Sequence, residues 1–290
     1  MSPALVVRLR GIGLLGPGLA DWATGQALLL APSGWRSTAT VLAAPSRLPP
    51  AERRRAGAIV KLSMTVAEQA CAGAAIDIRT LATVFSASTG DASNCHALCE
   101  ALASADPVVS PTRFTNSVHN AAAGYWHIAT GSRAASTSLC GFDASFGAGL
   151  LEAASQCVAG KRPVLLVAGD VPYPEPIHSI RPITDAFGLA LLLCADSDEA
   201  DADGTNPGPN PGANPDPKAG NCLRLSLRLR SDALEPSSCG HAGLDALRLG
   251  VPAARALPLL QAAALGRSTT LILPYLDNMM IEVSVIPAQP

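Results

Sequence analysis

Charged side chains are scarce in this sequence, and no long run of basic residues occurs. Asp, Glu, Lys and Arg together make up 15% of the 290 residues, and the formal net charge is −2. Nucleic-acid binding requires Lys and Arg clustered against the phosphates, so we expect no nucleic-acid partner. Hydrophobic residues make up 48% of the chain, which indicates a large core or a large interface.

Long apolar segments are missing as well. No stretch reaches the ~18 apolar residues that a membrane-spanning helix needs, so we expect no membrane insertion. Residues 1–15 are interrupted by Arg8, Arg10 and glycines, unlike the continuous apolar core of a signal peptide. The sequence therefore predicts a cytoplasmic protein.

The cysteines lack the repeated pairs of a metal site. Cys95, His96 and Cys99 resemble half of a zinc site, but the other cysteines stand singly and no second pair follows. Buried free thiols in a reducing compartment explain them better. We expect no metal and no other cofactor.

A glycine motif near the start also fails to indicate a cofactor. Residues 11–16 spell GxGxxG after an apolar run. A dinucleotide-binding turn continues directly into a helix and has an acidic residue about 20 positions later. Here Pro17 and Gly18 follow at once and no such acidic residue is found, so nucleotide binding is not expected.

The pattern of apolar residues predicts alternating strands and helices. Strands are expected at 6–15, 81–86, 134–139, 164–167, 186–194, 222–229, 270–273 and 280–285. Helices are expected around 21–22 and at 51–75, 94–103, 120–131, 144–159 and 254–265, with Gly160 as the C-cap of the fifth. Residues 196–221 are acidic and rich in Pro, Gly and Asn, which predicts a flexible linker between residues 1–195 and a shorter portion, 222–290.

Residues 134–170 carry the most informative pattern: a strand, a turn, a helix with small residues and a buried strand that ends at Ala168 and Gly169. This segment resembles the nucleophile region of the β-ketoacyl synthases. In that family the active cysteine lies about seventeen residues before the glycine that ends the helix. Counting back from Gly160 reaches Asp143, and Cys140 lies three residues too early. A carboxylate cannot form the acyl thioester, so the resemblance implies a family member without its catalytic nucleophile.

Asp143 has two structural interpretations. Aspartate is a favoured N-cap residue, and its charge suits the N-terminus of a helix. Asp143 could act only as such a cap, or as a cap that also fills the vestigial active pocket. Both interpretations deny it a nucleophilic role.

The most specific run is SPTRFTNSVHNAAAGYWHIATG at 110–131. Together with residues 137–154 and 186–194, it resembles the chain-length-factor-like ketosynthase homologues of bacterial aryl polyene and xanthomonadin-type pigment clusters. The resemblance covers roughly residues 5–195. It implies an α/β fold of the thiolase-like αβαβα type, with a complete N-terminal half and a truncated C-terminal half. The family's paired catalytic histidines belong to the second half, where this chain has only His241.

The resemblance implies a non-catalytic subunit that pairs with a catalytic β-ketoacyl carrier-protein synthase, edge to edge, through the strand at 134–139. Side chains at this seam would set the depth of the tunnel for a polyene that grows on an acyl carrier protein. Candidates for the tunnel or the interface are Phe114, Thr115, Val118, Leu139, Phe142 and Phe146. Phe142, next to the replaced cysteine, is the best single gate, although an apolar residue of this size can equally be a core residue.

Two other functions stay open at this point. The first is a stand-alone acyltransferase or thioesterase that uses Cys140 as nucleophile, or less favourably Ser138 or Ser145, with His119 as base. A histidine that only binds a backbone carbonyl is the commoner case. The second is a homodimeric scaffold that binds an acidic carrier protein without chemistry. Its contacts would be Arg53, Arg54, Arg55 and Arg113, although solvated surface charge is the ordinary explanation for such residues.

Overall fold

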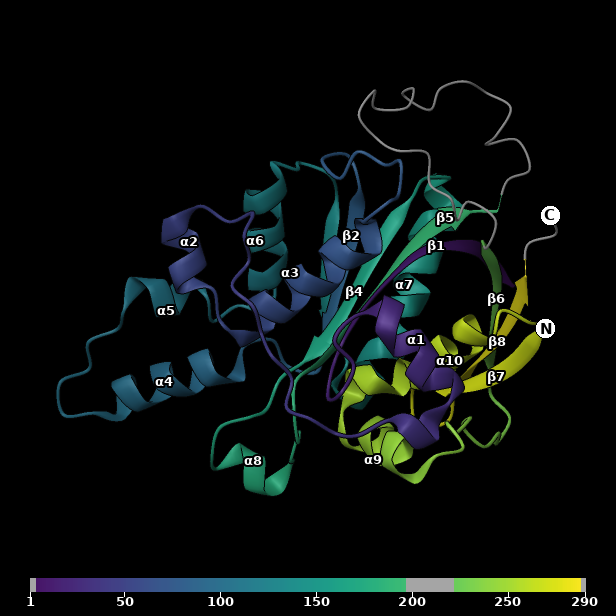
Figure 1. Cartoon of the computed structure of the whole chain (residues 1–290). Helices are drawn as coiled ribbons and strands as arrows, with labels where there is room; N and C mark the ends of the chain where they lie inside the picture. Colours follow the sequence, from purple (N-terminus) through teal and green to yellow (C-terminus); the bar gives the residue numbers. More distant parts are fainter. Residues whose placement is uncertain (1–3, 197–221, 288–290) are drawn as a thin grey trace.

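A computed structural model describes residues 4–196 and 222–287 (Figure 1). Apart from Asp196, the predicted linker at 196–221 lies outside the described residues. The strands are β1 Leu5–Leu15, β2 Ala82–Ala87, β3 Ser136–Cys140, β4 Val164–Asp170, β5 Phe187–Ala195, β6 Leu223–Arg230, β7 Thr269–Pro274 and β8 Met280–Pro287. The helices are α1 Trp22–Leu30, α2 Pro50–Arg55, α3 Ala58–Cys71, α4 Ala92–Ala103, α5 Pro111–Thr115, α6 Ala121–Thr130, α7 Ser145–Gly160, α8 Ile177–Ile180, α9 Ala242–Gly250 and α10 Leu257–Leu265. Three 3₁₀ turns complete the described structure: η1 Pro32–Gly34, η2 Phe142–Ala144 and η3 Pro252–Ala256.

The strands form one eight-stranded sheet in the order β3-β2-β4-β5-β1-β6-β8-β7 (Figure 1). Strands β3, β2 and β4 are mutually parallel, and the other pairings are antiparallel. The long strand β1 joins the two parts of the sheet, because it pairs with β5 on one side and, through Leu5–Leu9, with β6 on the other. Strand β3 therefore lies at one edge of the sheet, next to the N-terminal end of α7.

Helices cover both faces of the first part of the sheet. Helices α3 and α6 pack on one face, and α7 packs on the other together with η3. Strand β4 is buried on both faces: Leu166 and Ala168 point to the core around α7, while Leu165 and Val167 point to the core around α3. This two-sided burial explains why an uninterrupted apolar run predicted the strand.

The second part of the chain is short. It contributes β6, β7 and β8, which pack on α10 and η3 and carry no helix on their outer face within the described residues. The alternating burial of β6 reflects this arrangement, since Leu223, Leu225 and Leu227 are buried while Arg224 and Arg228 are exposed. The expected α/β fold with a complete first half and a truncated second half is confirmed.

Helix boundaries differ from the prediction at several places. The helix expected at 51–75 is two helices, α2 and α3, because Gly57 has an extended backbone between them. Helices α5 and α8 have no predicted counterpart. His241, which the sequence predicts as a loop or helix-start residue, is the N-cap of α9, and its Nδ1 accepts the N–H of Leu244. Gly160 is the last residue of α7 and not its C-cap; Lys161 holds that position in the left-handed conformation, with φ of 46°.

The GxGxxG motif at 11–16 has a packing role. A Cβ atom at Gly13 would lie 1.9 Å from the carbonyl oxygen of Val66, and one at Gly11 would lie 2.0 Å from that of Ala70. Any side chain at these positions would push α3 away from β1. The glycines therefore allow the backbones of a strand and a helix to touch.

Candidate functional site

The loops that follow the parallel strands β2, β3 and β4 converge at one end of the sheet, where open α/β sheets commonly place their functional residues. Ser88 follows β2, Phe142 and Asp143 follow β3, and Asp170 ends β4. The turn η3 of the second half reaches the same place through Ala253 and Arg255.

Asp143 is held by two arginines and does not cap a helix. Arg181 Nη2 donates to Asp143 Oδ1, and Arg255 Nη2 donates to Oδ2 at 2.9 Å. The N-cap of α7 is Ala144, without a side-chain cap, so the cap interpretation of Asp143 is wrong. Because the turn η2 intervenes before the helix, position 143 lies one residue too early to cap it.

Phe142 lies beside this ion pair in an unusual conformation. Its φ of 52° is in the left-handed region, which is uncommon for a bulky residue and is found chiefly at functional or constrained sites. The guanidinium carbon of Arg181 lies 3.3 Å from the centre of the Phe142 ring, in a cation–π contact. The ring is 62% exposed, so this apolar side chain is available at the surface.

Ser145 is committed to holding the turn. Its hydroxyl accepts the N–H of Gly141 at 3.0 Å and lies 2.9 Å from the carbonyl oxygen of Ala87 and 2.6 Å from that of Phe142. The side chain is buried. A hydroxyl engaged in this way is not the free nucleophile that the alternative function would need.

Asp170 is a buried carboxylate that links the two halves. Its Oδ1 accepts the N–H of Ser88 and its Oδ2 accepts the N–H of Ala253, both at 2.7 Å. Burial raises the pKa of Asp170 above its ordinary value. The Ser88 hydroxyl lies 2.6 Å from the Tyr173 hydroxyl.

Sequence reasoning missed four residues of this network: Asp170, Tyr173, Arg181 and Arg255. Asp170 alone had a visible signal, because an acidic residue directly after a buried strand must find hydrogen-bond donors. The arginines had none.

The structure does not join Cys140 and His119 into a catalytic pair. Partial burial raises the pKa of the Cys140 thiol, and the nearby Asp170 carboxylate raises it further. No hydrogen bond or ion pair involves His119 in the part of the chain that the structure describes. Cys140 therefore lacks the partner that would generate a thiolate.

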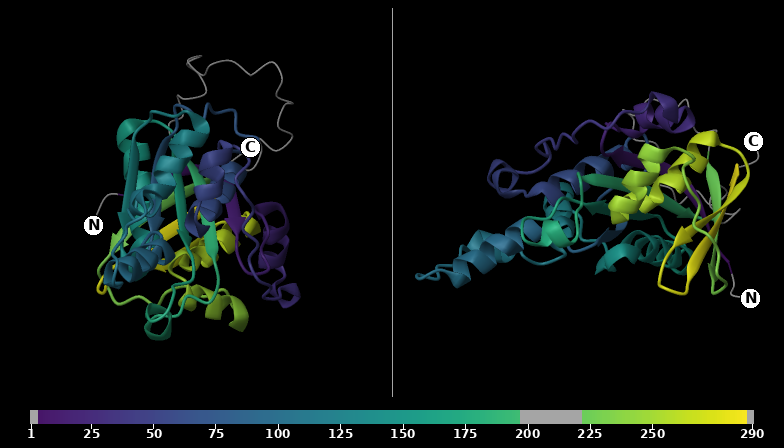
Figure 2. Two further views of the ribbon diagram at one scale, coloured as in Figure 1. Left: turned by 90° about the vertical axis from the view of Figure 1, so that its left-hand side faces the viewer. Right: turned by 90° about the horizontal axis from the view of Figure 1, so that it is seen from below.

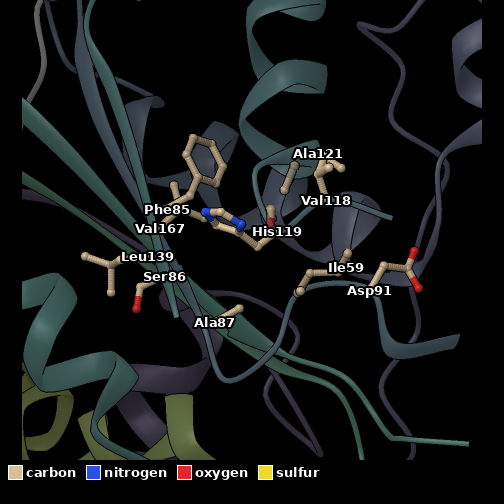
Figure 3. Close-up of a pocket in the computed structure, with 13 residues that line it drawn as sticks. Ile59, Phe85, Ser86, Ala87, Asp91, Val118, His119, Ala121, Leu139 and Val167 are labelled. Carbon is tan, nitrogen blue, oxygen red and sulfur yellow. The ribbon is translucent and has the colours of Figure 1, made fainter. Parts of the chain in front are cut away.

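Two hollows lie on either side of His119. The first, shown in Figure 3, has a volume of about 20 Å³, which is room for a single water molecule. In Figure 3 the His119 side chain lies between the loop that carries Val118 and the strand that carries Phe85. The second hollow is open, has a volume of about 360 Å³ and lies between α6 and the edge strand β3. Its walls include Ala123 and Gly124 of α6 and Ser136 and Ser138 of β3.

The structure places the six predicted tunnel and interface residues in different surroundings. Val118 and Leu139 line the small cavity. Phe114 and Thr115 are exposed on α5. Phe146 is 1% exposed, belongs to the core around α7 and lines neither hollow, so it is a packing residue in this structure.

Neither a metal site nor a membrane-spanning helix is found along residues 4–196 and 222–287. No group of three or more His, Cys, Asp or Glu side chains is placed to hold a metal ion. No helix in these ranges has both the length and the apolar character needed to cross a bilayer.

The sheet between helical layers, with the ends of β2, β3 and β4 meeting at α7, defines a thiolase-like α/β protein. Residues 22–226 match the family described as β-ketoacyl synthase, N-terminal domain, and the chain belongs to this family. The comparison with curated protein sequences produced no match.

Solved structures share the fold over almost the whole chain. A chain of the ketosynthase ApeO in complex with its chain length factor ApeC, from Xenorhabdus doucetiae, is 20% identical, with a TM-score of 0.67; the match covers 96% of this chain and 99% of that one. A chain of the ishigamide ketosynthase/chain length factor is 15% identical, with a TM-score of 0.63 and coverages of 98% and 99%. A chain of the AntDE:AntF complex, a type II polyketide acyl carrier protein with its ketosynthase bound to the hexaketide, is 11% identical, with a TM-score of 0.70 and coverages of 99% and 100%.

Proposed function

We propose that this chain is a non-catalytic, chain-length-factor-like subunit that pairs with a catalytic β-ketoacyl carrier-protein synthase in an aryl-polyene-type pathway. The observation that carries the proposal is that Asp143, which the family spacing predicts at the nucleophile position, has both carboxylate oxygens bound to arginines. An ion-paired carboxylate neither forms a thioester nor leaves room for one. The similar fold of a ketosynthase–chain length factor complex supports the pairing.

The edge strand β3 is the proposed seam with the catalytic subunit. Within the described residues it pairs only with β2, so its other side presents unpaired backbone groups. An open edge of this kind is a template for pairing with another chain. The open hollow between α6 and β3 lies along the same edge, and the small residues Ala123 and Gly124 in its wall allow close approach of a partner.

The segment formed by α4 and α5 supplies further contact surface. Figures 1 and 2 show these helices extending away from the sheet. Only Ala92 and Leu98 of α4 are buried, whereas Leu102, Val108 and Phe114 are 60–70% exposed. Exposed apolar side chains on a projecting segment are typical of an interaction site. We assign Phe114, Thr115 and Val118 to the partner interface on this basis.

Leu139 and Phe142 are the proposed tunnel residues. Leu139 lines the small cavity from the edge strand, and the exposed Phe142 ring lies beyond the end of that strand. The small cavity alone is too small for an acyl chain, so the tunnel would be completed by the partner. In this scheme the polyene grows from the partner's cysteine toward these side chains, while attached to an acyl carrier protein.

Part of the basic surface suggested for carrier-protein binding is already engaged. Arg53 donates to the carbonyl oxygens of Ser46 and Leu48, and Arg55 pairs with Glu52. Arg54 and Arg113 are exposed and carry the proposed carrier contact. An acidic carrier protein would then meet two basic side chains rather than four.

The test is co-expression of this chain with the ketosynthases encoded beside its gene, followed by size-exclusion purification and a condensation assay on an acyl carrier protein. A one-to-one complex is expected whose activity survives Cys140→Ala and whose product length changes with Phe142→Ala. The matched control Phe114→Ala alters complex affinity rather than product length. An isolated chain whose activity is lost with Cys140→Ala would overturn the proposal and establish the stand-alone enzyme.

A further inference from the structure

Arg181 and Arg255 converge on one carboxylate from opposite halves of the chain. Arg181 follows α8 in the first half, Arg255 lies in η3 of the second half, and Asp143 accepts a hydrogen bond from each. Both arginine side chains are 19% exposed, while the Asp143 side chain is 46% exposed. The two guanidinium groups are thus less exposed than the carboxylate that they share.

The two arginines depend on Asp143 to different degrees. Arg181 also stacks on the Phe142 ring. For Arg255, the carboxylate of Asp143 is the one hydrogen-bonding partner in the described parts of the chain. Removal of the carboxylate would take away the anion that both partly buried cations share, and Arg255 would lose its one partner among the described residues, which is costly.

We propose that Arg181 and Arg255 form a carboxylate-binding site that the chain fills with its own Asp143, and that this bound carboxylate latches the second half onto the first. Guanidinium groups recognise carboxylates by directional, charge-assisted N–H···O bonds, and here each guanidinium donates one such bond to a different oxygen of Asp143. An empty site therefore accepts a small free carboxylate. The inference does not depend on the proposed function.

The latch acts on η3, which a second carboxylate holds from the same side. Asp170 Oδ2 accepts the N–H of Ala253, two residues before Arg255. Turn η3 packs against α7, β4 and β5, so its position couples α9 and α10 to the first half. Loss of the Asp143 contact should loosen this coupling while the Asp170 contact keeps η3 in place, so an Asp143 variant should still fold.

The experiment measures thermal unfolding of the full chain in sodium acetate and in sodium chloride at equal ionic strength. In chloride, Asp143→Ala is expected to lower the unfolding midpoint by about 3 °C, a modest loss because the ion pair is partly exposed to solvent. In acetate, the midpoint of the same variant should recover most of this loss. The wild-type chain should give the same midpoint in both salts. Asp143→Asn should lose stability without recovery in acetate. The Asn amide occupies the space of the carboxylate, so acetate cannot enter, and the amide carries no negative charge.

Two controls isolate the site. Asp77→Ala removes an exposed carboxylate that pairs with Arg79, so it should show no acetate-specific recovery. Arg255→Gln in the Asp143→Ala chain should abolish the recovery by removing one of the two guanidinium groups. An equal effect of acetate and chloride on Asp143→Ala would overturn the carboxylate site.

A double-mutant cycle keeps the latch falsifiable if Asp143→Ala alone yields too little folded protein. The stabilities of Asp143→Asn, Arg255→Gln and the double variant are compared with the wild type. The double variant should cost less than the sum of the two single changes. Additive losses would mean that the two side chains do not act together, and the latch would be rejected.

Discussion

At the scale of single residues, the β3–α7 turn does not activate the thiol or the hydroxyl that the stand-alone enzyme would need. A reactive thiolate needs a neighbouring cation or a helix N-terminus to lower its pKa. Cys140 has the opposite surroundings, since burial and the Asp170 carboxylate both raise the pKa of its thiol. Ser145, the hydroxyl closest to the helix start, is occupied by the turn itself. Ser145 is therefore held in a structural role, and the thiol of Cys140 is not activated.

The raised pKa of Cys140 predicts a specific pH dependence of alkylation. Only the thiolate reacts with iodoacetamide, so the rate at Cys140 should keep rising from pH 7 to pH 9 without reaching a plateau. Mass spectrometry of the Cys140 peptide measures this rate, with N-acetylcysteine in the same solution as the reference. Faster reaction than the reference at pH 7, or a plateau below pH 8, would indicate an activated nucleophile.

At the scale of elements, two helices show how local backbone geometry relates to function. The C-cap of helix α7, Lys161, has a left-handed conformation that glycine adopts at much lower cost. Helix α6 carries Gly124 in its first turn, where an added Cβ would meet nothing within 4 Å. The left-handed conformation of Lys161 lowers the stability of the chain. The missing side chain at Gly124 leaves space next to the open hollow at β3, and packing within the chain does not require this space.

Lys161→Gly should stabilise the chain by about 1 kcal/mol, because it removes the strain of a side chain at positive φ. Chemical unfolding with urea measures the change in the free energy of unfolding. Lys161→Ala is the matched control and should give no such gain, since alanine keeps the Cβ atom. A gain from alanine equal to that from glycine would show that the conformation at 161 is not the cause.

Two substitutions of Gly124 test the stability of the lone chain and its pairing with the partner separately. Gly124→Ala should raise the stability of the lone chain by about 0.5–1 kcal/mol through helix propensity. Gly124→Phe should fill the hollow and weaken pairing with the ketosynthase by at least about tenfold, as read by a binding titration. The control Gly131→Ala, at a cap with φ of 70°, should lower stability but leave the affinity unchanged. Unchanged affinity of Gly124→Phe would remove the α6–β3 hollow from the interface.

The sequence patterns predicted the strands that are buried along their whole length and the strand whose burial alternates regularly. The apolar runs of β4 and β5 and the alternation of β6 were visible because each residue's environment follows from its position in the strand. The partners of Asp143 were invisible, because Arg181 and Arg255 lie 38 and 112 residues away in the sequence. The break at Gly57 was missed for a similar reason: a Cβ there would lie 2.2 Å from an oxygen of Asp91, a contact between distant segments.

At the scale of the whole molecule, the architecture is asymmetric. The first half has a sheet covered by helices on both faces, and the second half adds three strands whose outer face carries no helix within the described residues. Along the sheet, β3 ends in an open edge beside a hollow, and the α4–α5 segment extends with apolar side chains exposed. A surface of this kind supports the proposed pairing with a partner subunit.

Intact-mass analysis of the purified complex, after incubation with an acyl-carrier-protein donor, tests directly which subunit carries the nucleophile. A covalent acyl intermediate adds its mass to the subunit that carries the nucleophile. We expect acylation of the partner ketosynthase alone, with this chain unmodified at both Cys140 and Asp143. An acyl adduct on this chain that disappears with Cys140→Ala would contradict the non-catalytic role.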